Sequence, residues 1–143
     1  MIYIERPKSF DPKFGVVSCF VEHKREILLL HRQDHRPEGN TWGVPAGKVD
    51  GGEELLEALV REIKEETGFA LPPSQISYFR EVYVKYPNYD FVYHIYHTML
   101  DPKQKVSINP KEHKDFRWIS PENALNMPLI RDLDTCIKLF YED

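Results

Sequence analysis

The segment from Glu53 to about Thr67 constrains the fold of this 143-residue chain more than any other. Its apolar residues recur every three or four positions, which predicts an α-helix with one buried stripe. Gly68 stands where a left-handed C-terminal cap is expected, and Pro72 and Pro73 prevent the helix from resuming. The stripe consists of Leu55, Leu56, Leu59, Val60 and Ile63.

Three glutamates cluster on this helix, because Glu62 lies three and four residues before Glu65 and Glu66. Each exposed like-charge pair at this spacing costs roughly 0.2–0.5 kcal/mol of helix stability. Hard divalent cations prefer carboxylate oxygens, and Mg²⁺ shares its shell with phosphates and water. At the border of the stripe, towards the sheet edge and solvent, the cluster is either a cation site or a solvated acidic face interleaved with Arg61 and Lys64.

Short segments rich in Val, Ile, Leu and aromatic residues predict β-strands on both sides of the helix. Residues 15–22 and 26–31 form a predicted hairpin around a polar turn. Residues 76–84 and 91–100 form a predicted antiparallel pair, and residues 116–119 form another short strand. These strands predict a sheet that can bury the apolar stripe of the helix.

A C-terminal helix is predicted after the last strand. Ser120 is a good N-cap and Pro121 suits the first helical position. The residues expected to be buried on this helix are Ile130, Leu133, Ile137 and Phe140. Together these elements predict an α/β fold, with a mixed β-sheet sandwiched between helices. No repeat or linker interrupts the chain, so we expect residues 1–143 to form one domain.

Composition narrows the classes of function. Hydrophobic residues make up 41% and charged residues 29%, as in a folded globular protein, and no apolar run approaches the about 20 residues of a membrane span. No secretory signal is visible at the N-terminus, and Cys19 and Cys136 lack metal-ligand spacing, so we expect buried thiols in a reducing cytoplasm. The net charge of −4 argues against nucleic acid as the main partner.

The residues around the glutamates follow a longer pattern. Gly47 is followed after five residues by Glu53, and after seven more by the run 61–69, REIKEETGF. This pattern resembles the signature of the Nudix hydrolase family at every defined position. Residues 42–47, WGVPAG, are also similar to the usual approach to that signature, although Ala46 stands where many members have glycine. The resemblance implies the Nudix-type α/β/α sandwich.

The resemblance implies a pyrophosphohydrolase that depends on Mg²⁺ or Mn²⁺. Its substrate would be a small molecule, a nucleoside diphosphate linked to another group. A nucleoside triphosphate, a dinucleoside polyphosphate, a nucleotide sugar and ADP-ribose all remain open as substrates.

The resemblance also implies roles for the matching residues. Glu62 activates water, Arg61 orients a neighbouring glutamate through a salt bridge, and Glu65 completes the catalytic set. Glu53 and Gly68 support the motif, at the start and the end of the helix. The implied metal ligands are the carbonyl of Gly47 and the carboxylates of Glu62, Glu65 and Glu66.

The chemistry suits these residue types. Hydrolysis of a phosphoanhydride needs charge neutralisation on the phosphate oxygens and a water aligned opposite the leaving group. Metal ions supply both, and a carboxylate accepts the proton of the water. The sequence shows no Ser-His-Asp or Cys-His pattern. Lys48 follows Gly47, but no Ser or Thr comes next, so a Walker loop is absent.

Candidates outside the motif lie near the C-terminal strands. Glu112 precedes the strand that contains Trp118, where many family members carry a glutamate that acts as metal ligand or base. The alternative for Glu112 is an exposed side chain among lysines. His113 is expected to be a surface residue, although contact with phosphate is the alternative. His94 and His97 lie three apart in a strand and therefore point to opposite faces.

Three further residues are candidates for substrate contact. Arg32 and Arg36 follow the second strand and can reach phosphates, although solvated arginines are the ordinary alternative. Tyr86 lies in a region rich in tyrosine and phenylalanine, where most rings pack within the sheet and one or two can stack on a base. Its spacing from the motif is similar to that of a tyrosine in the diadenosine-polyphosphate hydrolases of the family.

Two other functions compete with the hydrolase. A non-catalytic nucleotide-sensing or protein-binding module can use the same fold, but such proteins usually lose motif glutamates, which this chain keeps. Decapping-type action on RNA is the other, and the sequence shows no basic stripe for it.

Overall fold

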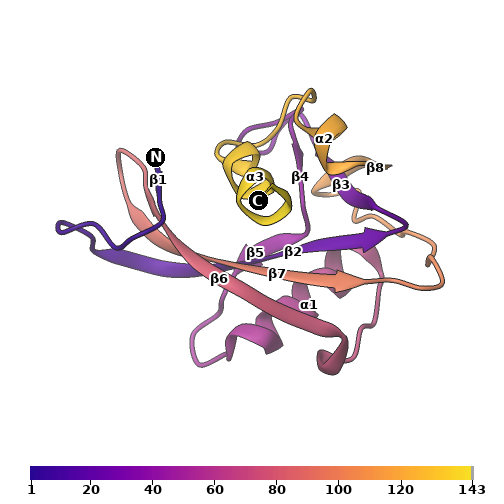
Figure 1. Ribbon diagram of the computed structural model, residues 1–143, viewed down its shortest axis with the longest axis horizontal. Helices are drawn as coiled ribbons and strands as arrows, with labels where there is room; N and C mark the ends of the chain where they lie inside the picture. The colour runs from indigo at the N-terminus through magenta and orange to yellow at the C-terminus, as the bar shows by residue number, and fades with distance from the viewer. Residues whose placement is uncertain (143) are drawn as a thin grey trace.

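The computed structural model describes residues 1–142 and shows a β-sheet between helices (Figure 1). Helix α1 (Leu55–Thr67) covers one face of the sheet, below it in Figure 1. Helices α2 (Pro121–Ala124) and α3 (Leu133–Tyr141) lie on the opposite side. The predicted α/β fold, with the sheet between helices, is confirmed.

Within residues 1–142, eight strands form one sheet in the order β1-β6-β7-β2-β3-β4, with β5 paired to β2 and β8 paired to β3. β2 and β7 are parallel and the other pairs are antiparallel, so the sheet is mixed. The predicted hairpin (β2 and β3) and the predicted antiparallel pair (β6 and β7) are both present. The strands are β1 (Ile2–Tyr3), β2 (Pro12–His23), β3 (Glu26–Arg32), β4 (Trp42–Gly43), β5 (Ala46–Lys48), β6 (Ile76–Lys85), β7 (Asp90–Met99) and β8 (His113–Ile119), with a 3-10 turn at Pro73–Gln75.

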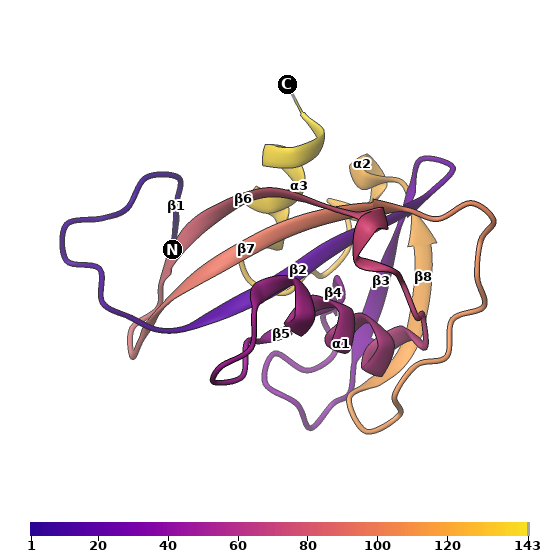
Figure 2. The same cartoon turned by 90° about the horizontal axis from the view of Figure 1, so that it is seen from below.

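Strands β2 and β3 separate soon after their turn. They pair only at Glu22–Ile27 and His23–Glu26. Beyond that point β2 pairs with β5 and β7, whereas β3 pairs with β4 and β8, and Figure 2 shows β3 and β8 running at a steep angle to β6 and β7. A wedge therefore opens between β2 and β3, and it brings the ends of β3, β5 and β8 beside α1.

The core has one layer on each face of the sheet, because alternate residues of a strand point to opposite faces. The stripe of α1 packs on one face and α3 packs on the other. Cys19 and Cys136 are both buried free thiols, as expected. The first layer includes Val17, Val21, Leu28, Leu30, Ala58, Leu59 and Ile63, and the second includes Phe20, Ile27, Leu29, Leu133 and Ile137.

The ends of α1 agree closely with the sequence pattern. The helix begins at Leu55 after Glu54, whose backbone N–H donates to Glu57 Oε1 at 2.9 Å. Gly68 adopts φ 81° and donates its N–H to the Lys64 carbonyl oxygen at 2.9 Å, as a left-handed cap should.

No helix within residues 1–142 has the length and apolar character that crossing a membrane requires.

The C-terminal region differs from the prediction. Ser120 does cap a helix that begins at Pro121, but this helix has only four residues. Ile130, expected on the C-terminal helix, precedes α3 in an extended segment. Trp42 donates to the Pro128 carbonyl and its own carbonyl accepts from Ile130, both at 2.9 Å. These bonds hold the segment against β4, so the helix is interrupted there.

Candidate active site

A cavity of about 380 Å³ lies in the wedge between β2 and β3, beside α1. It is assembled from strands, the loops at their ends and one helix face, and these come from five separate parts of the chain. Its lining contains both acidic and basic side chains. The lining residues are Val16, Arg32, Arg36, Ala46, Gly47, Lys48, Glu62, Glu66, Glu112 and His113.

Glu66 is buried, with 6% of its surface exposed. Its Oε2 accepts a hydrogen bond of 3.1 Å from the backbone N–H of Ala46. Burial, followed by the neighbouring charge of Glu62, raises the pKa of Glu66 well above its ordinary value. The expectation that the glutamates lie along a solvent-facing border is therefore wrong for Glu66, because β5 covers it.

Glu62 also lies inside the cavity, with 13% of its side chain exposed. Burial raises its pKa, although the ion pair with Arg61 opposes this shift. A Cβ atom added at Gly47 would lie 2.1 Å from Cδ of Glu62. Only glycine therefore lets the backbone of β5 approach this carboxylate so closely.

Arg61 organises the acidic residues around it. Its Nε and Nη2 donate to the two carboxylate oxygens of Glu53 at 2.8 and 3.0 Å, and its Nη1 donates to Glu62 Oε1 at 2.8 Å. The hydrogen bond from Arg61 lowers the pKa of Glu53 to about 2. Glu65 lies farther from Nη1, at 3.5 Å. The side chain of Arg61 thus fixes the orientation of Glu62.

The remaining acidic candidates are less buried. Glu65 has 54% of its side chain exposed, and Glu112 lies 3.7 Å from Arg36 Nη2. Within residues 1–142, no three His, Cys, Asp or Glu side chains already surround one point as metal ligands. The cavity nevertheless fits a hard cation. Glu62 lies against the Gly47 backbone and Glu66 accepts from the N–H of Ala46, and burial raises the pKa of both carboxyl groups. Carboxylate oxygens are the ligands that a hard cation prefers.

Basic side chains line the same cavity. Arg32 ends β3 and donates from Nε to the Pro37 carbonyl at 2.8 Å, which holds its stem in place. Arg32 and Arg36, two of the three predicted substrate residues, both line the cavity. Lys48 lines it as well, with Nζ 4.2 Å from the centre of the Phe14 ring. In the sequence, Lys48 was considered only as the lysine of a Walker loop, which is absent. Its place directly after Gly47 was the signal that could have found it.

His113 differs from the prediction of a surface residue, because only 5% of it is exposed and it lines the cavity. It pairs with Arg32 across β8 and β3, which places it under the loop after β3. Burial, with the charges of Arg32 and Arg36, lowers its pKa to about 4. Glu112 lies next to it in the chain, so both enter the cavity from one strand end.

His94 and His97 point to opposite faces, as predicted. His94 Nδ1 lies 3.1 Å from the Tyr78 hydroxyl. His97 Nε2 lies 2.9 Å from Glu22 Oε1, and its ring stacks on Phe140 of α3. Neither histidine lines the cavity. Both belong to the packing of the sheet.

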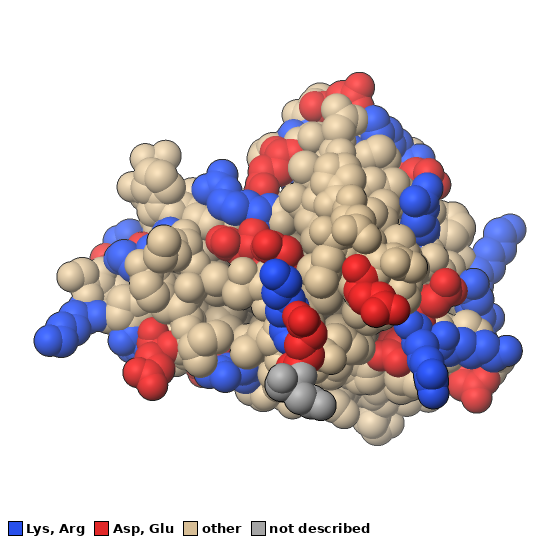
Figure 3. All heavy atoms as spheres, turned by 45° about the horizontal axis from the view of Figure 1, so that its top comes forward, with Lys and Arg blue, Asp and Glu red and all other residues tan. Residues whose placement is uncertain are grey.

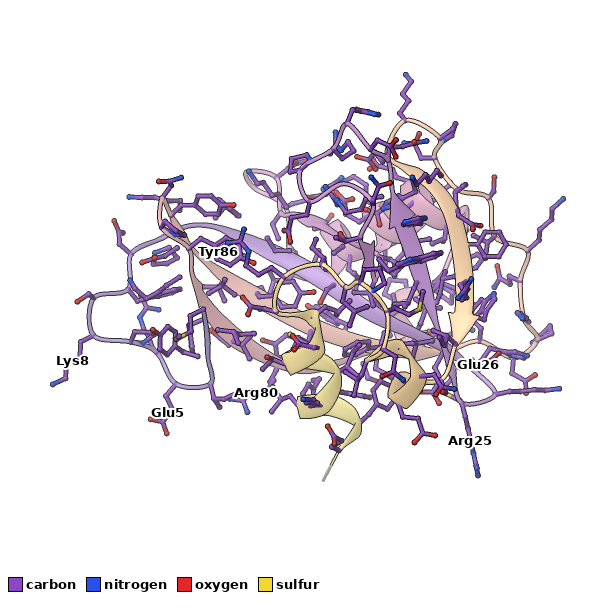
Figure 4. All side chains as sticks on the ribbon, turned by 90° about the horizontal axis from the view of Figure 1, so that it is seen from above. Glu5, Lys8, Arg25, Glu26, Arg80 and Tyr86 are labelled. Carbon is purple, nitrogen blue, oxygen red and sulfur yellow. The ribbon has the colours of Figure 1, made fainter. Side chains whose placement is uncertain are left out.

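Tyr86 is not part of the cavity lining. It lies in the hairpin turn that follows β6. In Figure 4, Tyr86 lies far along the sheet from Arg25 and Glu26, which mark the β2–β3 turn. The Arg131 guanidinium lies 4.3 Å from the centre of its ring. Burial raises the pKa of Tyr86 to about 12, and its side chain borders a separate hollow of about 60 Å³.

Charges of both signs are mixed on the surface. On the face shown in Figure 3, the Lys and Arg side chains alternate with Asp and Glu and form no continuous basic stripe. Duplex or RNA backbone binding relies on clustered positive charge. This face therefore gives no support to decapping-type recognition of RNA.

Comparison with known sequences identifies the family. A sequence model of the NUDIX domain matches residues 10–140. The CTP pyrophosphohydrolase of Escherichia coli (strain K12) is 32% identical over 116 residues, which cover 80% of this chain and 81% of that protein. Nudix hydrolase 2 of Arabidopsis thaliana is 25% identical over 130 residues, which cover 90% of this chain but only 46% of that protein.

Solved structures agree with the assignment of the fold. The MutT protein of Methanosarcina mazei Go1 superposes with a TM-score of 0.75 at 24% identity, covering 92% of this chain and 97% of that one. The Nudix domain of Shewanella oneidensis NrtR, solved with ADP ribose, gives 0.78 at 23% identity, covering 97% and 93%. The chain belongs to the Nudix family of hydrolases.

Proposed function

We propose that this protein is a pyrophosphohydrolase that uses Mg²⁺ or Mn²⁺ to hydrolyse a nucleoside diphosphate linked to another group. One observation carries the proposal. The carboxylates of Glu62 and Glu66 line one cavity together with Arg32 and Arg36; Glu66 is buried there and Glu62 lies against the Gly47 backbone. The carboxylates suit a hard cation, and the arginines suit phosphate oxygens.

The cation would be held by the Gly47 carbonyl with Glu62 and Glu66, joined by Glu65 and Glu112. When bound, it supplies charge neutralisation at the phosphate and lowers the pKa of a bound water. The motif cluster is thus proposed as a cation site in preference to a solvated acidic face, because Glu66 is only 6% exposed and solvent compensates its charge poorly.

The side chains of this protein then have separate tasks. Glu62, held by Arg61 at 2.8 Å, is the proposed acceptor of the proton from water, and Glu112 is the second carboxylate able to take it. Arg61 and Glu53 keep Glu62 oriented. Arg32, Arg36 and Lys48 neutralise phosphate oxygens that the cation leaves free.

The acidic and basic side chains of the cavity support a substrate with at least two linked phosphates. Nucleoside triphosphates are the first candidates, because the relative at 32% identity is named for CTP. Residues 1–143 are proposed to act as one catalytic domain, and the cytoplasmic location expected from the sequence stays a prediction.

Product identification tests this function. Purified protein is incubated with nucleoside triphosphates, dinucleoside polyphosphates, nucleotide sugars and ADP-ribose, in ¹⁸O-labelled water, with Mg²⁺ or with a chelator. We expect a nucleoside monophosphate product and metal-dependent incorporation of ¹⁸O into one product phosphate. Tight nucleotide binding without hydrolysis of any compound would favour the nucleotide-sensing module instead.

A further inference from the structure

Unsatisfied polar atoms concentrate in the active-site cavity. Within residues 1–142, three buried side-chain polar atoms lack a hydrogen-bond partner: Arg36 Nε, His113 Nδ1 and Asp132 Oδ2. The first two belong to residues that line the cavity with Glu62 and Glu66. Buried polar atoms in native proteins are normally paired, so unpaired atoms beside a cavity indicate a missing partner.

The backbone of His113 is held firmly although its ring is not. Its N–H donates to the Asn109 carbonyl at 2.9 Å, and its carbonyl accepts from Gln33 Nε2 at 3.4 Å. Its register partner is Arg32, at an irregularity between β3 and β8. Neither ring nitrogen makes a hydrogen bond within the described chain. The backbone of His113 is therefore fixed beside the cavity, while the hydrogen-bonding capacity of its imidazole is unused.

The surroundings of this ring favour an anionic ligand. Arg32 and Arg36 lie close enough to influence it, and Arg36 Nη2 is only loosely paired with Glu112, at 3.7 Å. A diphosphate offers more oxygens than a cation on Glu62 and Glu66 can bind, and the others need N–H donors. Imidazole and guanidinium groups are such donors.

We propose that His113 is a substrate-binding residue which, with Arg36, hydrogen-bonds phosphoryl oxygens of a diphosphate held in this cavity. This rests on the proposed function, because it assigns the phosphate contacts of the same site. No bond is made or broken by His113. Its contribution is to the affinity and orientation of the phosphate chain.

Inorganic pyrophosphate is the probe, because it contains the diphosphate and no other recognition element. Its affinity is measured by calorimetry with Mg²⁺ present, for the wild type, His113→Phe and His113→Gln. The phenyl ring fills the same space without a donor, whereas glutamine restores an N–H group. We expect the affinity to fall about tenfold in His113→Phe and to recover largely in His113→Gln. The matched control is His35→Phe, because His35 is exposed on the neighbouring loop.

Three further readouts distinguish the alternatives. Thermal melting identifies a variant that fails to fold. If His113→Phe fails to fold, the pyrophosphate affinity of His113→Gln is compared with that of His113→Asn, whose shorter amide reaches less far. Mn²⁺ affinity without pyrophosphate should be unchanged in every variant, and a loss there would make His113 a metal ligand and overturn the proposal. With substrate, KM should rise about tenfold and kcat should change less.

Equal pyrophosphate affinity in the wild type and His113→Phe would also overturn the proposal. His113 would then be a buried residue that serves packing alone. Failure of the proposed function gives a different result, because a wild type that hydrolyses no diphosphate fails before any variant is compared.

Discussion

The backbone of Gly47 lies directly against the carboxylate of Glu62, so that a Cβ atom at position 47 would come within 2.1 Å of Glu62 Cδ. The Gly47→Ala variant must therefore displace Glu62 or β5. Overpacking of this kind costs about 1–3 kcal/mol. Misplacement of a reacting group by about 1 Å can cost roughly 100-fold in rate. We expect a fall in kcat of about that size.

A matched control is available in the loop that follows. A Cβ atom at Gly51 would meet nothing within 4 Å, so Gly51→Ala should leave kcat and melting temperature nearly unchanged. Steady-state kinetics and thermal melting of the two variants measure the difference. Equal activity of both variants would show that close approach at Gly47 has no role in catalysis.

Removing the charge of Glu66 should affect stability and metal response in opposite ways. In Glu66→Gln, the amide can still accept from Ala46, while the buried charge disappears. We expect metal-free protein to gain about 1 kcal/mol at pH 7, or about 3 °C in melting temperature. Addition of Mg²⁺ should raise the melting temperature of the wild type only. A variant that is less stable than the wild type in chelator would contradict the assignment of an uncompensated charge.

The pH dependence of that difference follows from the raised pKa of Glu66. Above the ordinary value of 4.5 the folded protein binds more protons than the unfolded chain, so this carboxyl group lowers stability as the pH rises. The gap between Glu66→Gln and the wild type should therefore widen from pH 4.5 upwards in chelator. Urea unfolding at a series of pH values measures it.

Glu53 should behave in the opposite sense, because its pKa is lowered to about 2 by Arg61. Its stabilising contribution is complete above 4.5, the ordinary value, and is lost as the pH falls towards 2. We expect Glu53→Gln to be less stable than the wild type at pH 6, with the two converging near pH 2. A difference independent of pH would show that packing, and not charge, explains the loss.

Helix α3 is tied to the sheet by a hydrogen bond that the active site does not use. The Tyr141 hydroxyl donates to Glu22 Oε1 at 2.8 Å, and His97 Nε2 lies 2.9 Å from the same oxygen. Tyr141→Phe should cost about 1 kcal/mol of unfolding free energy and leave kcat unchanged. Tyr89→Phe, at an exposed ring, is the control and should cost little.

Local patterns in the sequence predicted the elements that depend on neighbouring residues. The stripe of α1, its Gly68 cap and the strand pairs were all correct, because periodicity and turn residues determine them. The interruption before α3 was missed, since it depends on backbone bonds between Trp42 and the distant residues Pro128 and Ile130. No local pattern contains that information.

The candidate site also has features that the sequence predicted and features that it did not. The spacing of the motif placed Glu62 and Glu66 together, but the burial of Glu66 depends on its covering strand β5. His113 was predicted to lie on the surface. Its burial depends on the pairing of β8 with β3, which no local pattern contains. Tyr86 was a candidate by its spacing alone, and the structure places it outside the cavity lining.

Diffraction from crystals grown with Mn²⁺ and a non-hydrolysable nucleoside triphosphate tests the proposed cation site most directly, because Mn²⁺ gives an anomalous signal that locates it. A peak within about 2.5 Å of the Glu62 and Glu66 carboxylates and the Gly47 carbonyl, with a phosphate oxygen as a shared ligand, is the predicted result. Bound nucleotide with no anomalous peak beside these carboxylates would contradict it.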